Sequence, residues 1–378
     1  MSFKGDTLNT ADSATDRGRS ALIVGYYGAG NLGDELMLFC LKKWLEDQGI
    51  QVTVAAQFPE VVESLQRLPA VPNLPLLGQW SWVESYLKGQ IAPLWKALYR
   101  SDLVIVGGGD IIRDDIGGKT FLYSVEKLLV AILAWKSASL INVGIGEPRT
   151  KPRRRLLQFL LRRCKSIIVR DESSLQLCRR FGAVHAILAP DIVFELPRIA
   201  NMKPVPEGKR VLVCLREDAN VYGRFVLNET RIANFAAALD HLIDARGLEV
   251  AFVPFQSSES GDDNRLHELV RSQMKFRDRA EILPWEFDMD RLLRLFGEAA
   301  CVIAMRLHAG VLGAACGRRV LVLPYDRKVT EFAKQFHCLA VEANQLDELA
   351  TAIFGIESVL AVLPTSCPES VWGRLRLT

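Results

Sequence analysis

The chain has 378 residues, which is too long for one ordinary hydrophobic core and predicts two domains. Hydrophobic residues make up 49% and charged residues 24%, as is typical of a soluble globular protein, and a net charge of +3 argues against a general nucleic-acid binder. The eight cysteines include no C-x-x-C pair, which indicates the reduced thiols of a cytoplasmic protein and argues against structural zinc.

Residues 1–20 are polar and lack the apolar segment of a secretory signal, so we expect them to be disordered. The longest strongly apolar stretch, "LLVAILAW" at 128–135, is much shorter than the roughly 20 residues that span a bilayer. We therefore expect a cytoplasmic protein without a membrane span.

The first conspicuous loop, "GYYGAGNLGDE" at 25–35, follows an apolar run and contains glycines with the spacing G-x-G-x-x-G. A dinucleotide site also needs a pyrophosphate on the first turn of the next helix and an acid about 20 residues further on. Here that turn carries Asp34 and Glu35, which would repel phosphate, and the second apolar run ends at Gln57 without an acid. An oxidoreductase is therefore a weak alternative.

From residue 21 onwards, short β-branched runs alternate with longer amphipathic segments, as in parallel sheets with crossover helices. The predicted strands are 21–27, 51–56, 102–109, 139–146, 166–171, 185–191, 210–217, 249–256, 280–284, 301–308, 319–326 and 337–343. The proline-containing segment 195–210 has no periodicity and reads as a linker. We expect an α/β protein of two doubly wound Rossmann-like lobes, 21–204 and 205–378, with the site in the cleft between them.

Ligands of such sheets bind at the carboxyl ends of the strands. At the end of the third predicted strand, "GGGD" (107–110) indicates close approach of a ligand or of the other lobe, or a tight turn. In "RDESS" (170–174), Asp171 is a natural helix N-cap. Arg170 is then left to reach a ligand or to form a structural salt bridge.

The stretch "RLHAG" (306–310) is the sharpest single feature. An extended backbone would place Arg306 and His308 on the same side of the strand. Among the five histidines, His308 alone combines an arginine neighbour, a glycine-rich setting and a strand end. The next strand end, "PYDRKV" (324–329), supplies Tyr325, Asp326 and Lys328. Asp326 is also a natural helix N-cap.

A basic run without any acid extends from Arg149 to Lys165 and encloses the apolar "LLQFLL". On a helix it forms a basic amphipathic surface. We consider two roles for it: a solvated face, or a contact with anionic lipid or a lipid-diphosphate acceptor at the inner face of the membrane.

In this order, "GNLGDE", "GGGDIIRDD", "GIG", "RDESS", "APDIVF", "RLHAGVLGAACG" and "YDRKV" make the chain resemble the polysaccharide pyruvyl transferase family from about Ala21 to Phe336, with its bacterial cell-wall polymer branch nearest. The resemblance implies a two-lobed fold similar to GT-B glycosyltransferases. It also implies transfer of the pyruvyl unit of phosphoenolpyruvate to two hydroxyls of a sugar in a cell-surface polysaccharide or its lipid-linked precursor. The products are a pyruvate ketal and phosphate, and no cofactor or metal is expected.

The resemblance also suggests roles for individual residues. Phosphoenolpyruvate carries a phosphate and a carboxylate, so its pocket needs cations, and both proton transfers need a shuttle that works near neutral pH. We expect His308 and Arg306 to be catalytic. The expected donor-binding residues are Lys328, Arg170, Arg216 and Tyr325. The expected acceptor-binding residues are Asn31, Asp34, Glu35, Gly108 and Asp110.

Two alternatives keep the same fold. One is a glycosyltransferase that uses a nucleotide sugar, but such enzymes commonly carry an acid for the donor ribose, and no acid occurs between Glu298 and Asp326. The other is a non-catalytic carbohydrate-binding protein. The presence of Arg306, His308 and Lys328 argues against it.

Overall fold

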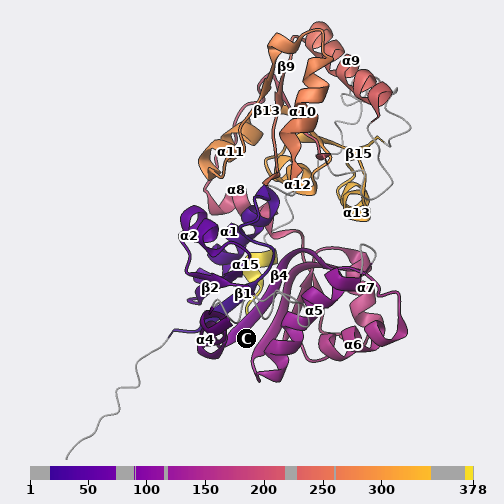
Figure 1. The fold of residues 1–378 in the computed structure, drawn as a ribbon. Helices are drawn as coiled ribbons and strands as arrows, with labels where there is room; N and C mark the ends of the chain where they lie inside the picture. Colours follow the sequence, from indigo (N-terminus) through magenta and orange to yellow (C-terminus); the bar gives the residue numbers. More distant parts are fainter. Residues whose placement is uncertain are drawn as a thin grey trace, which may run out of the picture.

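The computed structural model describes residues 18–73, 89, 91–114, 118–217, 228–258, 261–341 and 371–377, without the side chains of residues 110–111 and 118–120. Most of the N-terminal stretch predicted to be disordered, residues 1–17, lies outside this range. The molecule consists of two α/β lobes stacked end to end (Figure 1).

The first lobe is built on a seven-stranded sheet with the order β3-β2-β1-β4-β5-β6-β7. All its strand pairs are parallel. The strands are β1 (Ser20–Val24), β2 (Gln51–Ala56), β3 (Ala70–Pro72), β4 (Leu103–Ile112), β5 (Ser137–Ile145), β6 (Ser166–Val169) and β7 (Ile187–Leu188). From β1 the chain adds β2 and β3 on one side, and from β4 onward it adds strands on the other side. Doubly wound sheets bind their ligands at this change in strand order, between β1 and β4.

The second lobe repeats this topology with six parallel strands in the order β12-β9-β8-β13-β14-β15. The strands are β8 (Arg210–Cys214), β9 (Glu249–Phe252), β12 (Ala280–Ile282), β13 (Ala299–Ala304), β14 (Arg319–Val322) and β15 (Leu339–Ala340). A small antiparallel pair, β10 (Ser257–Ser258) and β11 (Gly261–Asp262), follows β9. The prediction of two doubly wound Rossmann-like lobes is thus confirmed.

Helices cover both faces of each sheet. In the first lobe they are α1 (Leu32–Glu46), α2 (Pro59–Gln66), α4 (Ile91–Arg100), α5 (Gly118–Leu133), α6 (Lys151–Leu161) and α7 (Glu172–Arg180), followed by η1 (Ile192–Glu195) and α8 (Leu196–Ile199). In the second lobe they are α9 (Glu229–Arg246), α10 (Asp263–Ser272), η3 (Arg277–Arg279), α11 (Met289–Gly297), α12 (Leu307–Ala315) and α13 (Arg327–Gln335).

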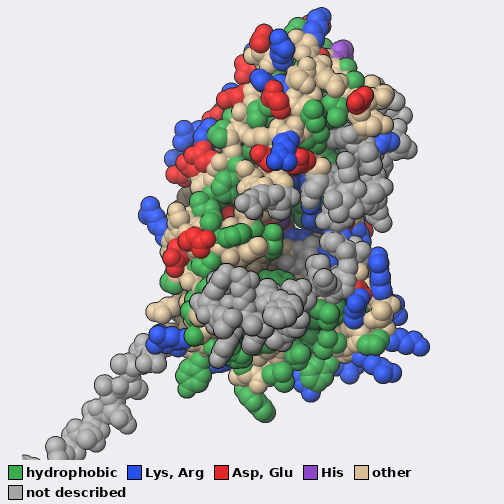
Figure 2. All heavy atoms as spheres, in the orientation of Figure 1, with side chains coloured by type: hydrophobic (Ala, Val, Ile, Leu, Met, Phe, Trp, Pro, Cys, Tyr) green, Lys and Arg blue, Asp and Glu red, His purple; other side chains and the backbone are tan. Residues whose placement is uncertain are grey.

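The two faces of the first sheet belong to different cores. Side chains of α4, α5, α6 and α7 share a core of their own with one face. Side chains of α1 pack on the other face, in a core that continues through η1 and α8 into the second lobe. The outer surface of α4, α5 and α6 therefore faces away from the second lobe, and Figure 2 shows hydrophobic and basic side chains along that end of the molecule.

The C-terminal segment returns to the first lobe. Trp372 of α15 (Val371–Arg374) is buried and packs edge-to-face on Trp44 of α1, with ring centroids 5.2 Å apart. The indole nitrogen of Trp44 donates to the carbonyl of Trp372, and that of Trp372 donates to the carbonyl of Pro190. Residues 371–377 thus lie with the first lobe, although the predicted boundary assigned 205–378 to the second (Figure 1).

All twelve predicted strands are present, together with the unpredicted β3, β10 and β11, and most of the twelve end earlier than expected. β13 ends at Ala304, Arg306 is the N-cap residue of α12, and His308 lies in the first turn of that helix. The expectation that an extended backbone places Arg306 and His308 on one side is therefore wrong. The helical turn sends the two side chains to different partners.

Candidate functional site

A cavity of about 360 Å³ lies between the two lobes at the carboxyl ends of their strands. Its first-lobe lining comes from Val24, Gly25, Tyr26, Asn31, Asp34, Asn73, Val106, Gly109, Arg113, Tyr123, Ser124, Lys127 and Arg170. Its second-lobe lining comes from Arg216, His308 and Lys328. Cations thus surround a buried histidine in a space large enough for a small organic substrate.

The glycine-rich loop before α1 joins the two lobes. The amide of Leu32 donates to the carbonyl of Phe255 (2.7 Å), and the amide of Ser257 donates to the carbonyl of Gly30 (3.1 Å). Gly30 has φ +71°, and a Cβ there would clash with the carbonyl of Ser257. At Gly30, the glycine therefore permits contact between the backbones of the two lobes.

Asn31 and Asp34 line the cavity as predicted for the acceptor side, whereas Glu35 does not. Asn31 also caps α1 by accepting from the amide of Gly33. Burial raises the pKa of Asp34 to about 7, although Lys328 lowers it. Glu35 is fully buried. It accepts from the amide of Gly28 (2.7 Å) and from Gln66 (3.1 Å), and these bonds hold it inside the loop, away from any sugar.

His308 and Asp191 form a buried pair. Nε2 of His308 lies 3.5 Å from Oδ2 of Asp191, an ion-pair distance that is long for a hydrogen bond. Burial lowers the pKa of His308, as do Arg170 and Lys328, whereas Asp191 raises it. The other ring nitrogen faces Gly33, where a Cβ would clash with it. A first-lobe aspartate and a first-lobe glycine thus position a second-lobe histidine.

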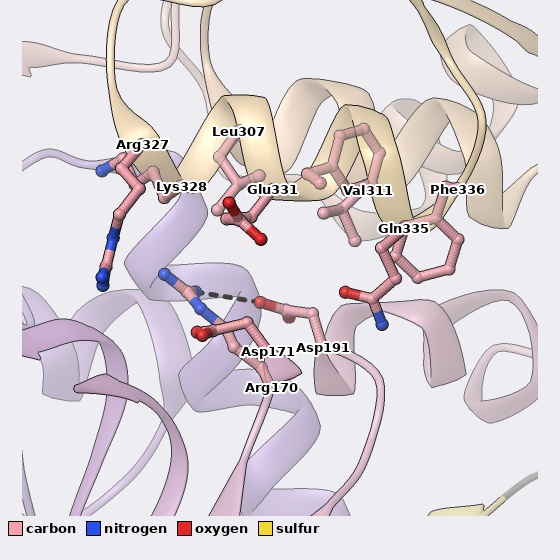
Figure 3. A pocket seen from close by; sticks show the side chains of 11 residues that line it. Arg170, Asp171, Asp191, Leu307, Val311, Arg327, Lys328, Glu331, Gln335 and Phe336 are labelled. Carbon is pink, nitrogen blue, oxygen red and sulfur yellow. Dashed lines mark hydrogen bonds and ion pairs between the residues drawn. The ribbon is translucent and has the colours of Figure 1, made fainter. Parts of the chain in front are cut away.

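Arg170 reaches from the end of β6 toward the second lobe (Figure 3). Its guanidinium donates to Asp191 (3.0 Å) and also lines the cavity. Burial alone would raise the pKa of Asp191, but its contacts with His308 and Arg170 hold that pKa well below its usual range. The structural salt bridge considered for Arg170 is therefore present, and the guanidinium still lines the cavity wall, so a ligand contact stays a prediction. Asp171 caps α7, as expected.

Lys328, in the first turn of α13, lines the cavity and makes no ion pair with any residue that the structure describes.

Arg216 also lines the cavity, and its guanidinium donates to the phenol oxygen of Tyr325 (2.6 Å). Tyr325 is fully buried and does not line the cavity, contrary to its predicted donor-binding role. It holds Arg216 in place instead.

Arg306 does not line the cavity, contrary to the prediction that it is catalytic. Its guanidinium forms a bidentate bond with Asp263 (2.9 and 2.5 Å) and is 7% exposed. Asp263 also accepts from the amides of Phe255 and Gln256, which belong to the segment that touches the first lobe. Arg306 therefore stabilises the joint between the lobes.

Gly108 was predicted to approach a ligand, but the space in front of it is filled by Tyr27. A Cβ on Gly108 would clash with the hydroxyl of Tyr27, which donates to the carbonyl of Gly107 (2.7 Å). The next residue, Gly109, lines the cavity. The backbone of Asp110 lies in β4, and its side chain is outside the described part of the chain.

The structure also brings to the cavity residues that sequence reasoning missed. Arg113 forms a buried bond with Asp326 of the second lobe (2.7 and 3.3 Å), so Asp326 does not cap α13. Tyr123 and Lys127 come from α5, and burial lowers the pKa of Lys127 to about 8. No motif marked the α5 residues, because they lie on an ordinary amphipathic helix.

No group of three or more His, Cys, Asp or Glu side chains in the described part of the chain is arranged to hold a metal ion. None of the described helices is both long and apolar enough to cross a bilayer.

Two Rossmann-like lobes with a cavity between the carboxyl ends of their sheets define a GT-B-like protein. Solved structures support this class. S. aureus MnaA with UDP superposes with a TM-score of 0.63, at 13% identity, over 91% of this chain and 90% of that one. Anabaena Alr3699/HepE with UDP-glucose gives a TM-score of 0.55, at 14% identity, over 94% of each chain.

The sequence pattern described as "Polysaccharide pyruvyl transferase" matches residues 31–327, and the chain belongs to that family. A relative, the amylovoran biosynthesis protein AmsJ of Erwinia amylovora, is 20% identical over 358 residues, which cover 83% of this chain and 85% of AmsJ. AmsJ fits the predicted bacterial cell-wall polymer branch of the family. Family and relative together support a transferase that modifies a polysaccharide.

Proposed function

We propose that this protein transfers the pyruvyl unit of phosphoenolpyruvate to two hydroxyls of a saccharide, forming a ketal and releasing phosphate. The observation that carries the proposal is the placement of His308 beside Lys328 in a cavity lined by Arg170 and Arg216. A trianionic donor needs several cations close together, and a carbon that must be protonated needs an acid among them.

Lys328 is the leading candidate for the donor phosphate, because it lines the cavity and forms no direct ion pair with any described acid. Arg170 and Arg216 stand on opposite lobes and can meet the carboxylate or the remaining phosphate oxygens. On the first-lobe wall, Asn31 and Asp34 offer hydrogen bonds to sugar hydroxyls. The saccharide, either free or carried on a lipid diphosphate, would enter from this side.

In the first step, an acceptor oxygen bonds to C2 of phosphoenolpyruvate while protonated His308 delivers its proton to C3, which becomes a methyl group. The hydroxyl proton passes to Asp34 or another base at the cavity wall. In the second step, another acceptor oxygen bonds to C2, and the C2–O bond to phosphate breaks. Phosphate leaves with the electron pair, and the second hydroxyl proton goes to it. The two hydroxyl protons are thus balanced by the one gained at C3 and the one carried by phosphate.

Binding of phosphoenolpyruvate can be tested without an acceptor. A ligand at 100 times its dissociation constant stabilises the fold by about 2.7 kcal/mol, so thermal unfolding should shift upward with phosphoenolpyruvate but not with nucleotide sugars or NAD. Lys328→Ala should weaken that binding roughly tenfold to hundredfold, the value of a hydrogen bond to a charged group.

Lys334→Ala is the matched control, because Lys334 lies on the same helix, is 70% exposed and is outside the cavity. Its affinity for phosphoenolpyruvate should equal that of the natural chain. A shift only with a nucleotide sugar would favour a glycosyltransferase and reject the proposal. No thermal shift with phosphoenolpyruvate, nucleotide sugars or NAD would favour a non-catalytic carbohydrate-binding protein.

A further inference from the structure

The end of the first lobe that faces away from the cavity exposes large apolar side chains. Trp135 is 95% exposed, Tyr99 is 83% exposed and Leu133 is 65% exposed, and the rings of Trp95 and Phe159 are also in solvent. Exposed apolar residues are ordinary when they are scattered, whereas a contiguous set marks a contact surface.

These residues gather at neighbouring ends of helices. Nζ of Lys136, just after α5, donates to the carbonyl of Tyr99 at the end of α4 (2.7 Å) and lies 5.5 Å from its ring centroid. On α6, which contacts α5, the guanidinium of Arg163 stacks 3.7 Å from the ring centroid of Phe159. Tyr99 and Phe159 therefore each have a cation beside the ring.

The charge of this surface is predominantly positive, although Asp102, beside Lys136, is exposed. Helices α4, α5 and α6 contain a single acid, Glu126, and it is buried. Of the nearby acids, Asp102 accepts hydrogen bonds from the amide and hydroxyl of Ser20. The basal surface, as we name it, comprises Trp95, Lys96, Tyr99, Arg100, Leu133, Trp135, Lys136, Phe159, Arg162, Arg163 and Lys165.

The basic run 149–165 contributes only part of this surface. Leu157, Leu160 and Leu161 of α6 are buried in the core, so the apolar residues of α6 are not available to a membrane, which one of the two roles considered for this run would require. Two arginines of its first half are also paired with acids, Arg153 with Asp114 and Arg154 with Glu147. The apolar part of the surface comes from the ends of α4 and α5 instead.

We propose that the basal surface docks the protein on an anionic lipid bilayer. Tryptophan and tyrosine settle at the level of lipid headgroups, because their rings are apolar and their polar atoms stay hydrated. Lysine and arginine around them are attracted to anionic headgroups. A second copy of the chain fits less well, since a symmetric dimer would set this basic surface against itself.

Docking would also orient the cavity. Tyr123 and Lys127 in the first half of α5 line the cavity, and Trp135 follows eight residues after Lys127. The helical part of this segment, from Lys127 to Leu133 at the end of α5, spans about 9 Å, and Trp135 follows in the next turn. If the proposed function holds, which this step requires, an acceptor anchored in the bilayer could reach the cavity while the protein stays docked.

Sedimentation of the full chain with vesicles tests the docking itself. Vesicles of phosphatidylcholine with phosphatidylglycerol should bind the protein, vesicles of phosphatidylcholine alone should bind it at least tenfold more weakly, and added salt should weaken binding. The double variant Tyr99→Ser/Trp135→Ser and the double variant Arg162→Glu/Arg163→Glu should each lose at least tenfold in affinity.

Leu269→Ser and Arg277→Glu are the controls, since both side chains are exposed on the second lobe, and both variants should bind as the natural chain does. Equal binding by the Tyr99/Trp135 variant, or no binding to anionic vesicles, overturns the proposal. The proposal is also overturned if light scattering shows that the natural chain is a dimer and that the Tyr99→Ser/Trp135→Ser variant is a monomer. The phosphoenolpyruvate-induced thermal shift should persist in every basal-surface variant, so failure of docking and failure of the proposed function give different results.

Discussion

At the residue scale, His308 experiences opposing influences on its protonation. Burial and the cations Arg170 and Lys328 favour the neutral ring, while Asp191 favours the protonated one. Because the proposed proton donor is the protonated ring, we expect Asp191 to act as a positioning residue whose charge opposes the lowering of the pKa of His308.

Replacement of Asp191 by Asn should therefore lower the pKa of His308. The lost charge lies 3.5 Å from Nε2, and an opposite charge at this range typically shifts a pKa by about 1 to 3 units. NMR titration of the ring, assigned by its absence in His308→Ala, measures this directly. In turnover, the loss of activity with rising pH should begin at lower pH.

Asp171→Asn provides the control for that titration. Asp171 caps α7 and adjoins Arg170, but it makes no recorded contact with His308, and asparagine is also a good cap. The pKa of His308 should be unchanged in this variant. An unchanged pKa in Asp191→Asn as well would show that Asp191 does not tune the histidine.

At the element scale, the loop before α1 connects the lobes by main-chain hydrogen bonds. Its glycines matched a nucleotide-binding spacing, yet each has a different steric reason. Gly28 approaches the carbonyl of Phe58, Gly30 approaches Ser257, and Gly33 approaches His308. A local pattern cannot distinguish these causes, because the neighbours come from distant parts of the chain.

Gly30→Ala should destabilise the protein more than Gly49→Ala. Both glycines have positive φ, +71° and +72°, so both variants incur the left-handed strain of about 1–2 kcal/mol. Only Gly30 faces a backbone atom, whereas nothing lies within 4 Å of a Cβ at Gly49. Denaturant unfolding of the two variants separates the strain from the contact, and equal losses would mean that the joint at Ser257 contributes nothing.

At the scale of the whole molecule, a buried ion pair links the lobes beside the cavity. Arg113 and Asp326 are both about 5% exposed and form two hydrogen bonds. Such a pair stabilises little relative to apolar groups of similar size, but removal of one partner leaves an uncompensated buried charge. It therefore specifies how the lobes meet.

Arg113→Met and Asp326→Leu should each cost about 3–5 kcal/mol, and the double variant should recover much of that loss. A double-mutant cycle on the free energy of unfolding gives the coupling. The exposed pair Arg271–Glu268 is the control, and its coupling should not exceed about 1 kcal/mol. Additive losses at Arg113 and Asp326 would mean that the two side chains do not interact.

The sequence alone determined the order of strands and helices, the two doubly wound lobes, the family and the cap at Asp171. Hydrophobic periodicity and capping are local, so neighbouring residues suffice to predict them. It also singled out His308 and Lys328, because strand ends of parallel sheets converge.

Only the tertiary structure decided which charged residues face the cavity. The sequence predicted that Arg306 contacts the ligand, but its guanidinium donates to Asp263, 43 residues earlier in the chain. Glu35 was also predicted to contact the ligand, but its carboxylate accepts a hydrogen bond from Gln66. Tyr123 and Lys127 line the cavity although no motif marked them, and Arg113 lines it although the motif "GGGDIIRDD" gave it no predicted role. The physical reason is that a buried charge needs a partner, and the packing of both lobes selects that partner among residues far apart in the chain.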